Sequence, residues 1–96
     1  MPHLVISAAA LADLKRLRGF LHTKNPRAAK EAALTIIEAV QSLQLYPEMG
    51  RTIETKGEEL RELFINSGNY GYLAKYKFDE REVVILAIKH GREASY

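Results

Sequence analysis

Six consecutive apolar residues occupy positions 83–88, and they are followed directly by Lys89, His90, Gly91 and Arg92. An apolar run of this length is typical of a β-strand that is buried on both faces. Because such a strand is held rigidly in the core, the polar residues after it are set at a fixed edge of the fold. We therefore expect a functional site of this chain to lie near that polar segment.

Length and composition restrict the classes of protein that this chain can represent. Its 96 residues predict a single domain, residues 1–96, with a modest core. It contains no cysteine, which excludes disulfides and cysteine zinc sites and makes a reducing cytoplasm the expected compartment. The longest apolar run falls well short of the roughly 20 residues that span a bilayer, so no membrane association is expected. A net charge of +2 is below that of a dedicated DNA binder.

Two amphipathic helices are predicted in the first half of the chain, after a short strand at residues 3–6. Ser7 is suited to cap the first helix, and Asn25 with Pro26 is suited to begin the second. Apolar residues recur at helical spacing, which predicts an antiparallel helical hairpin. They are Ala10, Leu14, Leu17 and Leu21 in the first helix and Ala29, Ala33, Ile36, Ile37, Val40 and Leu43 in the second. The basic residues near the tip are interpreted as a solvated face: Arg16, Arg18, Lys24 and Arg27.

Three strands are predicted in the second half of the chain, at residues 60–65, 70–78 and 83–89, joined by turns short enough for hairpins. Residues 52–59 are polar and predict a loop. The expected fold is therefore α+β in the order β-α-α-β-β-β. Its N-terminal strand and antiparallel helical hairpin are expected to pack on an antiparallel sheet.

The middle predicted strand, residues 70–78, alternates between an aromatic and a basic face. The aromatic face carries Tyr70, Tyr72, Ala74, Tyr76 and Phe78, and the basic face carries Gly71, Leu73, Lys75 and Lys77. Aromatic side chains in this pattern suit packing against the helices better than stacking on RNA bases, so we expect the tyrosines in the core. The basic face is expected to meet solvent or a partner.

Four sequence markers follow one another along this framework. They are Leu43-x-x-Tyr46-Pro47-x-x-Gly50-Arg51, then Leu60-Arg61-Glu62-Leu63, the tyrosine-rich strand ending Tyr76, and Ile85-Leu86-Ala87-Ile88-x-His90-Gly91-Arg92. In this order they make nearly the whole chain similar to the RelE/ParE superfamily of toxins from bacterial toxin–antitoxin pairs. The resemblance implies a cytoplasmic toxin held inactive by a cognate antitoxin, whose flexible, acidic and partly helical C-terminal segment wraps the toxin.

Two branches of this superfamily differ in their chemistry. RelE-like members cut messenger RNA in the ribosome and resemble one another in an arginine within a Gly-Tyr-Arg segment, whereas ParE-like members inhibit DNA gyrase. The matching segment here reads Gly71-Tyr72-Leu73, and leucine cannot donate a hydrogen bond to a phosphate. The preceding strand carries only Arg61, and the loop before it is acidic, which repels RNA. The sequence therefore favours a ParE-like, non-enzymatic toxin that stops growth by contact with gyrase and binds no nucleic acid sequence-specifically on its own.

Partner-binding residues are expected at the ends of the core elements. We expect Arg61, His90, Arg92 and Arg51 to contact the antitoxin or the target, because arginine and histidine pair with carboxylates. Each also has an ordinary interpretation. Arg61 can pair with Glu62 or a neighbouring acid, and His90 can be a hydrogen-bonding anchor. Arg51 and Arg92 can be exposed, solvated arginines.

The alternative hypothesis is a RelE-like, ribosome-dependent mRNA endoribonuclease. Cleavage beside a 2′-hydroxyl requires a base, an acid and cations around the phosphorane. The residues that would supply them are His90, Arg61, Lys75 and Tyr96. A third hypothesis is a degenerate toxin that has kept only antitoxin binding. The histidines show no metal-ligand spacing, so neither a metal nor a cofactor is expected.

Overall fold

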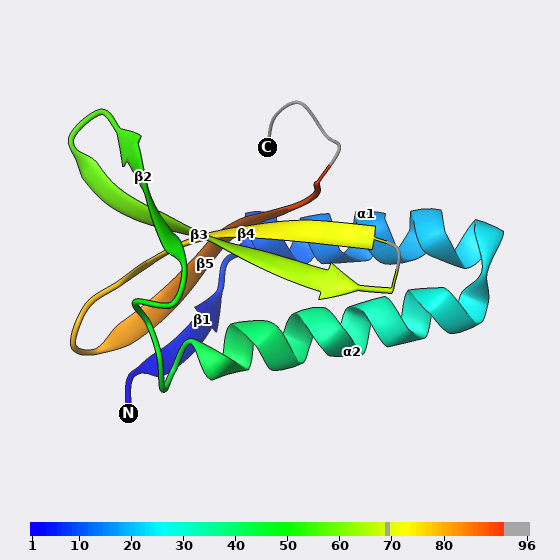
Figure 1. Ribbon diagram of the computed structural model, residues 1–96, viewed down its shortest axis with the longest axis horizontal. Helices are drawn as coiled ribbons and strands as arrows, with labels where there is room; N and C mark the ends of the chain where they lie inside the picture. The colour runs from blue at the N-terminus through cyan, green and yellow to red at the C-terminus, as the bar shows by residue number, and fades with distance from the viewer. Residues whose placement is uncertain (69, 92–96) are drawn as a thin grey trace.

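The computed structural model of the chain describes residues 1–68 and 70–91, with Glu54 described by its backbone only. The elements follow the order β1 (His3–Ile6), α1 (Ala8–Lys24), α2 (Pro26–Ser42), β2 (Arg51–Thr55), β3 (Glu58–Ser67), β4 (Tyr70–Phe78) and β5 (Glu82–His90). Figure 1 shows the two long helices running side by side next to a single twisted sheet. The α+β fold predicted from the sequence, a helical hairpin packed on a mainly antiparallel sheet, is confirmed.

Both predicted helix caps are present. The Ser7 side chain accepts a hydrogen bond from the Ala10 N–H at 3.1 Å, and the Asn25 side chain accepts one from the Ala28 N–H at 3.2 Å. Each cap satisfies an N–H group that has no partner within its own helix. Because Asn25 ends α1 and caps α2 in the same residue, the chain reverses there without an intervening loop.

The sheet has five strands in the order β1-β5-β4-β3-β2. All neighbours are antiparallel except β1, which pairs in parallel with β5 at the edge of the sheet. The last described strand, β5, therefore lies between β1 and β4. The apolar run at residues 83–88 forms most of β5, but it is buried on both faces only in part. Val84 and Leu86 are half-buried, because the helices pack on the other face of the sheet.

The register of β5 against β4 shifts at Lys75 and Tyr76, whose partners are Ala87 and Ile85. This leaves Leu86 as the extra residue of a β-bulge, and a bulge disrupts the ladder locally. Two side chains near the N-terminus form hydrogen bonds with the backbone at this bulge. The Ser7 hydroxyl donates to the Leu86 carbonyl at 3.2 Å, and a carboxylate oxygen of Asp13 accepts from the Ile88 N–H at 2.9 Å.

Residues 52–59 do not form the loop predicted from their polarity. Arg51–Thr55 is a strand paired with the extended first half of β3, and the turn between them contains Gly57 at a φ of +76°. Glycine adopts this left-handed conformation without the steric cost that a Cβ imposes. The signal that was missed is the pair of β-branched threonines, Thr52 and Thr55, on either side of Ile53, followed by a Lys-Gly turn.

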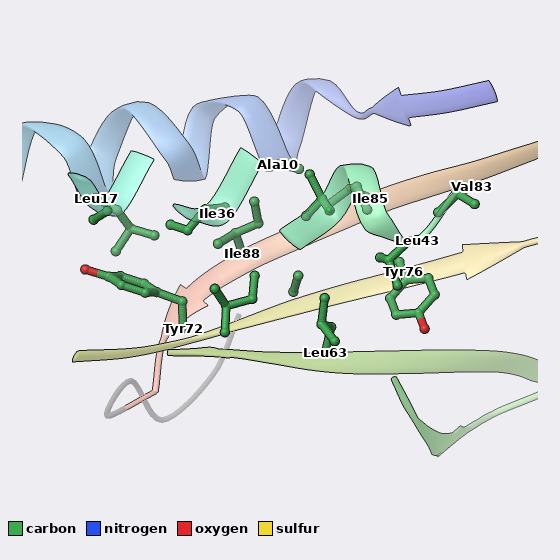
Figure 2. Close-up of a cluster of buried hydrophobic side chains, with 14 of the residues drawn as sticks. Ala10, Leu17, Ile36, Leu43, Leu63, Tyr72, Tyr76, Val83, Ile85 and Ile88 are labelled. Atoms are coloured by element: carbon green, nitrogen blue, oxygen red, sulfur yellow. The ribbon is translucent and has the colours of Figure 1, made fainter. Parts of the chain in front are cut away.

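The core lies between the helices and the inner face of the sheet (Figure 2). Tyr72 and Tyr76 are fully buried there, which confirms the core position predicted for two of the three tyrosines. Tyr70 differs, since it begins β4 and is 41% exposed. The largest side chains that are fully buried come from both layers of the fold: Tyr72, Tyr76, Ile36, Leu43, Ile85, Ile88, Val40 and Val83.

Candidate functional site

His90, the last residue of β5, lies on the helix-facing side of the sheet. Its register partner on β4 is Tyr72, a core residue. The His90 ring meets Tyr72 edge-on with centroids 5.5 Å apart, and it meets Tyr70 in the same way at 5.7 Å. The imidazole is therefore held between two aromatic rings at the edge that the sequence singled out.

A cleft of about 710 Å³ opens beside this histidine, between the second half of α1 and the adjoining ends of β4 and β5. We call it the His90 cleft. It is lined by Arg16, Leu17, Phe20, Leu21, Lys24, Tyr70, Tyr72 and His90. The Lys24 ammonium lies 5.1 Å from the centre of the Phe20 ring, which is a cation–π distance. The cleft thus combines apolar and aromatic walls with two cations, a composition suited to a segment that is both acidic and apolar.

Tyr72 contributes an unusual polar atom to this region. Its hydroxyl is buried and is one of the two buried side-chain atoms without a hydrogen-bond partner in the described part of the chain. Figure 2 shows the hydroxyl pointing toward Leu17 of α1. Burial raises the pKa of the Tyr72 hydroxyl, and the nearby Tyr70 raises it further, so the group stays a neutral donor at physiological pH. Leaving such a donor unpaired costs about 1–3 kcal/mol.

Arg61 is committed largely to the inside of the protein. Its side chain is 18% exposed, and its guanidinium donates to the carbonyl oxygens of Glu48 at 3.1 Å and Gly50 at 2.8 Å. The guanidinium also lies 5.7 Å from the centre of the Phe78 ring. Of the two pairings considered from the sequence, the structure shows a long contact of 3.9 Å with the neighbouring acid Glu59.

Arg51 forms an ion pair with Glu62. Its guanidinium donates to one carboxylate oxygen from Nη2 at 2.8 Å and from Nε at 3.3 Å. Glu62 is only 7% exposed although it is charged, whereas the Arg51 side chain is 76% exposed. The arginine therefore compensates a carboxylate at the surface of the sheet while keeping one side open to solvent.

The outer face of the sheet carries Leu73, the residue that decided between the two branches in the sequence analysis. Leu73 on β4 lies between its register partners Phe64 on β3 and Lys89 on β5, and Lys75 follows on the same face. Leu73, at the position where a cutting toxin is expected to have an arginine, therefore lies on the open face of the sheet, with Lys89 across from it and Lys75 two residues further along β4.

Within the described part of the chain, the residues proposed for the alternative nuclease do not converge. His90 and Lys75 lie on opposite faces of the sheet, because β4 alternates from Tyr72, the partner of His90. Arg61 is on the same face as His90, but its partner Tyr76 is four residues from Tyr72. On a strand that rises about 3.3 Å per residue this separation is roughly 13 Å.

Two of the predicted site residues, Arg92 and Tyr96, lie outside the described residues. Within residues 1–68 and 70–91, no group of three or more histidine or acidic side chains is placed to hold a metal ion. In the same part of the chain, none of the helices has the length and apolar content needed to cross a membrane.

The cleft was only partly visible in the sequence. Its basic residues Arg16 and Lys24 were noted, but as part of a solvated helix face. What the sequence could not supply is that α1 passes over the ends of β4 and β5 at this point, so that these cations face His90. Phe20 carried a signal of its own, as a large aromatic residue outside the apolar stripe of its helix.

The fold described above is the one expected from the sequence for a small toxin of a toxin–antitoxin pair. The chain belongs to the family described as "ParE toxin of type II toxin-antitoxin system, parDE", whose model matches residues 4–95. Among solved structures it is similar to a chain of the "Chromosomal ParDE TA system from P. aeruginosa", with a TM-score of 0.77 and 27% identity over 94% of this chain and 96% of that one.

Curated relatives carry names from the other branch of the superfamily. The chain is 31% identical to Toxin RelE3 of Caulobacter vibrioides over 97% of its own length and 98% of the relative's. It is 34% identical to Toxin RelE2 of the same organism over 94% of this chain and 96% of the relative. The chain is thus the toxin component of a type II toxin–antitoxin system, within a group that carries both ParE and RelE names.

Proposed function

We propose that this toxin acts in the cytoplasm as an inhibitor of DNA gyrase, by protein contact and without catalysis of its own. The observation that supports this most directly is Leu73, which occupies the open face of the sheet between Phe64 and Lys89 where a cutting toxin carries an arginine. Stabilising the doubly charged phosphorane of RNA cleavage requires a donor at that place, and leucine has none.

The dispersal of the remaining candidates supports the same proposal. A general base has to lie within hydrogen-bond reach of the proton that it removes, and the cation has to lie beside the same phosphate. His90 and Lys75 are separated by the sheet, and Arg61 is bound to the backbone of residues 48–50. The same scaffold offers broad surfaces to proteins, which suits inhibition by contact.

Neutralisation by the antitoxin is proposed to use the His90 cleft. The cleft presents Arg16 and Lys24 beside apolar and aromatic walls, which complements an acidic, partly helical segment. Partner binding by His90, Arg51, Arg61 and Arg92 stays a prediction, and for Arg61 the contribution we favour is to hold the loop before β2 in place.

A second candidate function, RNA cleavage in the ribosome, is favoured by one specific observation. Lys89 lies across from Leu73 on the open face and Lys75 follows two residues along β4, so two cations stand near the position whose expected arginine is absent. The RelE names of the curated relatives agree with this alternative.

The two functions are separated by assaying the purified toxin on both targets. We expect it to block supercoiling by gyrase and to stabilise cleaved DNA, and to leave ribosome-bound messages intact in primer-extension mapping. New cuts within translated codons, with supercoiling unaffected, would replace the proposal by the nuclease function. If induction without antitoxin leaves colony counts unchanged, the chain is instead a degenerate toxin that has kept only antitoxin binding.

A further inference from the structure

The loop after α2 exposes an unusual amount of apolar surface. Within five residues, Leu45 is 61% exposed, Tyr46 is 63% exposed and Met49 is 50% exposed. With Pro47 and Glu48 they surround an open hollow of about 630 Å³. We call residues 45–49 the apolar loop. Single exposed apolar residues are ordinary on protein surfaces, but a contiguous group of them marks a site of interaction.

Side chains on the sheet hold this loop rigidly. The Tyr76 hydroxyl donates to the Pro47 carbonyl at 2.7 Å and accepts from the Gly50 N–H at 2.9 Å. The Arg61 guanidinium donates to the carbonyls of Glu48 and Gly50. Gly50 is required for this arrangement, since a Cβ there would lie 2.7 Å from the Tyr76 ring and 2.9 Å from a backbone oxygen of Glu62.

Within the loop, the Met49 N–H also donates to the Tyr46 carbonyl at 3.1 Å. The backbone of the apolar loop is thus fixed at both ends and across its turn, while its large side chains project outward. A surface fixed before binding loses little conformational freedom when a partner arrives. Tyrosine and methionine are also among the residues enriched at the centres of protein interfaces.

We propose that the apolar loop is the surface by which the toxin grips its protein target. The partner it fits offers an apolar side chain to the hollow and a cation to Glu48, the one charged side chain within residues 45–49. This inference rests on the proposed function, because it requires a target that is bound as a protein. It adds to that function the part of the toxin that makes the contact.

Two other occupants fit the apolar loop less well. An acidic antitoxin segment would meet the like charge of Glu48, and it has a cationic site in the His90 cleft near the other end of the hairpin. The 17 residues of α2 span about 25 Å, so the loop after Ser42 is well separated from the hairpin tip at Pro26. A second copy of the chain would need roughly 800 Å² per partner for a stable dimer, more than five residues provide.

The test is a pair of charge substitutions at the loop with a matched control on α2. The variant Tyr46→Glu, Met49→Glu changes two exposed side chains and leaves the bonds to Tyr76 and Arg61 in place. The control Leu34→Glu introduces one glutamate, half the charge added in the loop variant, at a residue that is 54% exposed on α2. Affinity for gyrase and for the antitoxin is measured by surface plasmon resonance, and growth arrest is measured after induction.

We expect the loop variant to bind gyrase at least tenfold more weakly and to lose growth arrest, while its affinity for the antitoxin stays within twofold of wild type. The Leu34→Glu control should match wild type in all three measurements. Unchanged gyrase binding by the loop variant would overturn the inference and leave the proposed function standing. Equal weakening by the control would also overturn it, since any added acid would then suffice.

If the wild-type toxin does not bind gyrase, the proposed function fails. The inference about the apolar loop is then tested by the growth-arrest measurement alone. Loss of arrest in the loop variant, with antitoxin binding intact, would then assign the loop to a different target protein. Arrest that persists in the variant, or a wild type that arrests nothing, would overturn the inference as well.

Discussion

The hydroxyl of Tyr76 donates a 2.7 Å hydrogen bond to the carbonyl oxygen of Pro47, which lies 29 positions earlier in the chain. Tyr76 is fully buried on β4, while Pro47 stands in the apolar loop at the surface. One polar atom in the core therefore sets the conformation of a surface segment. The same hydroxyl accepts a hydrogen bond from the Gly50 N–H, so it also fixes the backbone just before β2.

Removing this hydroxyl should destabilise the protein. In Tyr76→Phe the buried Gly50 N–H and the Pro47 carbonyl both lose their partner, and each unsatisfied buried group costs about 1–3 kcal/mol. For a domain of this size 1 kcal/mol corresponds to a change of roughly 4–8 °C in Tm, measured by circular dichroism. Tyr70→Phe, at a residue that is 41% exposed, is the control and should change the free energy of unfolding by less than about 0.5 kcal/mol.

Removing the hydroxyl of Tyr72, by contrast, should not lower the free energy of unfolding. The Tyr72 hydroxyl is buried without a partner, so Tyr72→Phe removes an uncompensated polar group and should leave the free energy of unfolding unchanged or raise it by about 1 kcal/mol. A loss of stability comparable to that of Tyr76→Phe would show that the hydroxyl is satisfied in solution.

The bulge in β5 depends on a side chain from α1. Asp13 accepts from the Ile88 N–H at 2.9 Å, so Asp13→Ala should cost about 1–3 kcal/mol of folding free energy in urea titrations. Asp13→Asn keeps an oxygen that can accept the same bond, and it should recover most of the loss. Equal destabilisation by both substitutions would mean that the charge of Asp13, and not its acceptor atom, stabilises the bulge.

Charge in the His90 cleft should govern antitoxin binding. Lys24→Glu places an acid beside Phe20. We expect this change to lower the affinity of the toxin for the antitoxin by about tenfold, which corresponds to about 1.4 kcal/mol of binding free energy. Lys30→Glu on α2 makes the same charge change at an exposed residue outside the cleft and should have little effect. Titrations at two salt concentrations check the interpretation, because the loss in Lys24→Glu should shrink as salt rises.

Stability in acid should depend on the turn before β5. The N–H groups of Arg81 and Glu82 donate to Asp79 at 2.7 Å and 2.9 Å and lower the pKa of its carboxyl below the ordinary value. A lowered native pKa means that the carboxylate stabilises the fold above the unfolded-state pKa, and that this contribution is lost as the pH falls through the native pKa. Unfolding curves of Asp79→Ala should therefore depend less on pH below about pH 4 than those of wild type.

Much of the fold was predictable because local signals agreed with one another. The caps at Ser7 and Asn25 coincided with the start of apolar periodicity, and alternation in residues 70–78 marked the buried tyrosines. The strand Arg51–Thr55 was missed because most of its residues are polar. It is stabilised by its pairing with β3, and an apolar pattern reports buried residues but not strand pairing.

The candidate site was predictable only at one end. The position of His90 after an apolar strand pointed to the correct edge of the sheet, but the cleft there is completed by α1 residues that lie more than sixty positions away in sequence. The commitment of Arg61 to backbone carbonyls was equally hidden, because its acceptors belong to a loop whose path depends on Tyr76. Periodicity reports which face a residue occupies, and it does not report which distant segment covers that face.

The parallel pairing of β1 with β5 has a consequence for synthesis. Residues 3–6 are made first, yet the strand beside them in the sheet is formed by residues 82–90, the last described strand to be made. Contacts between such distant segments form only after most of the chain is available, and they are slow to form. A growing polypeptide therefore cannot complete this sheet until residues 82–90 have been synthesised, so a shorter nascent fragment does not yet present the folded toxin.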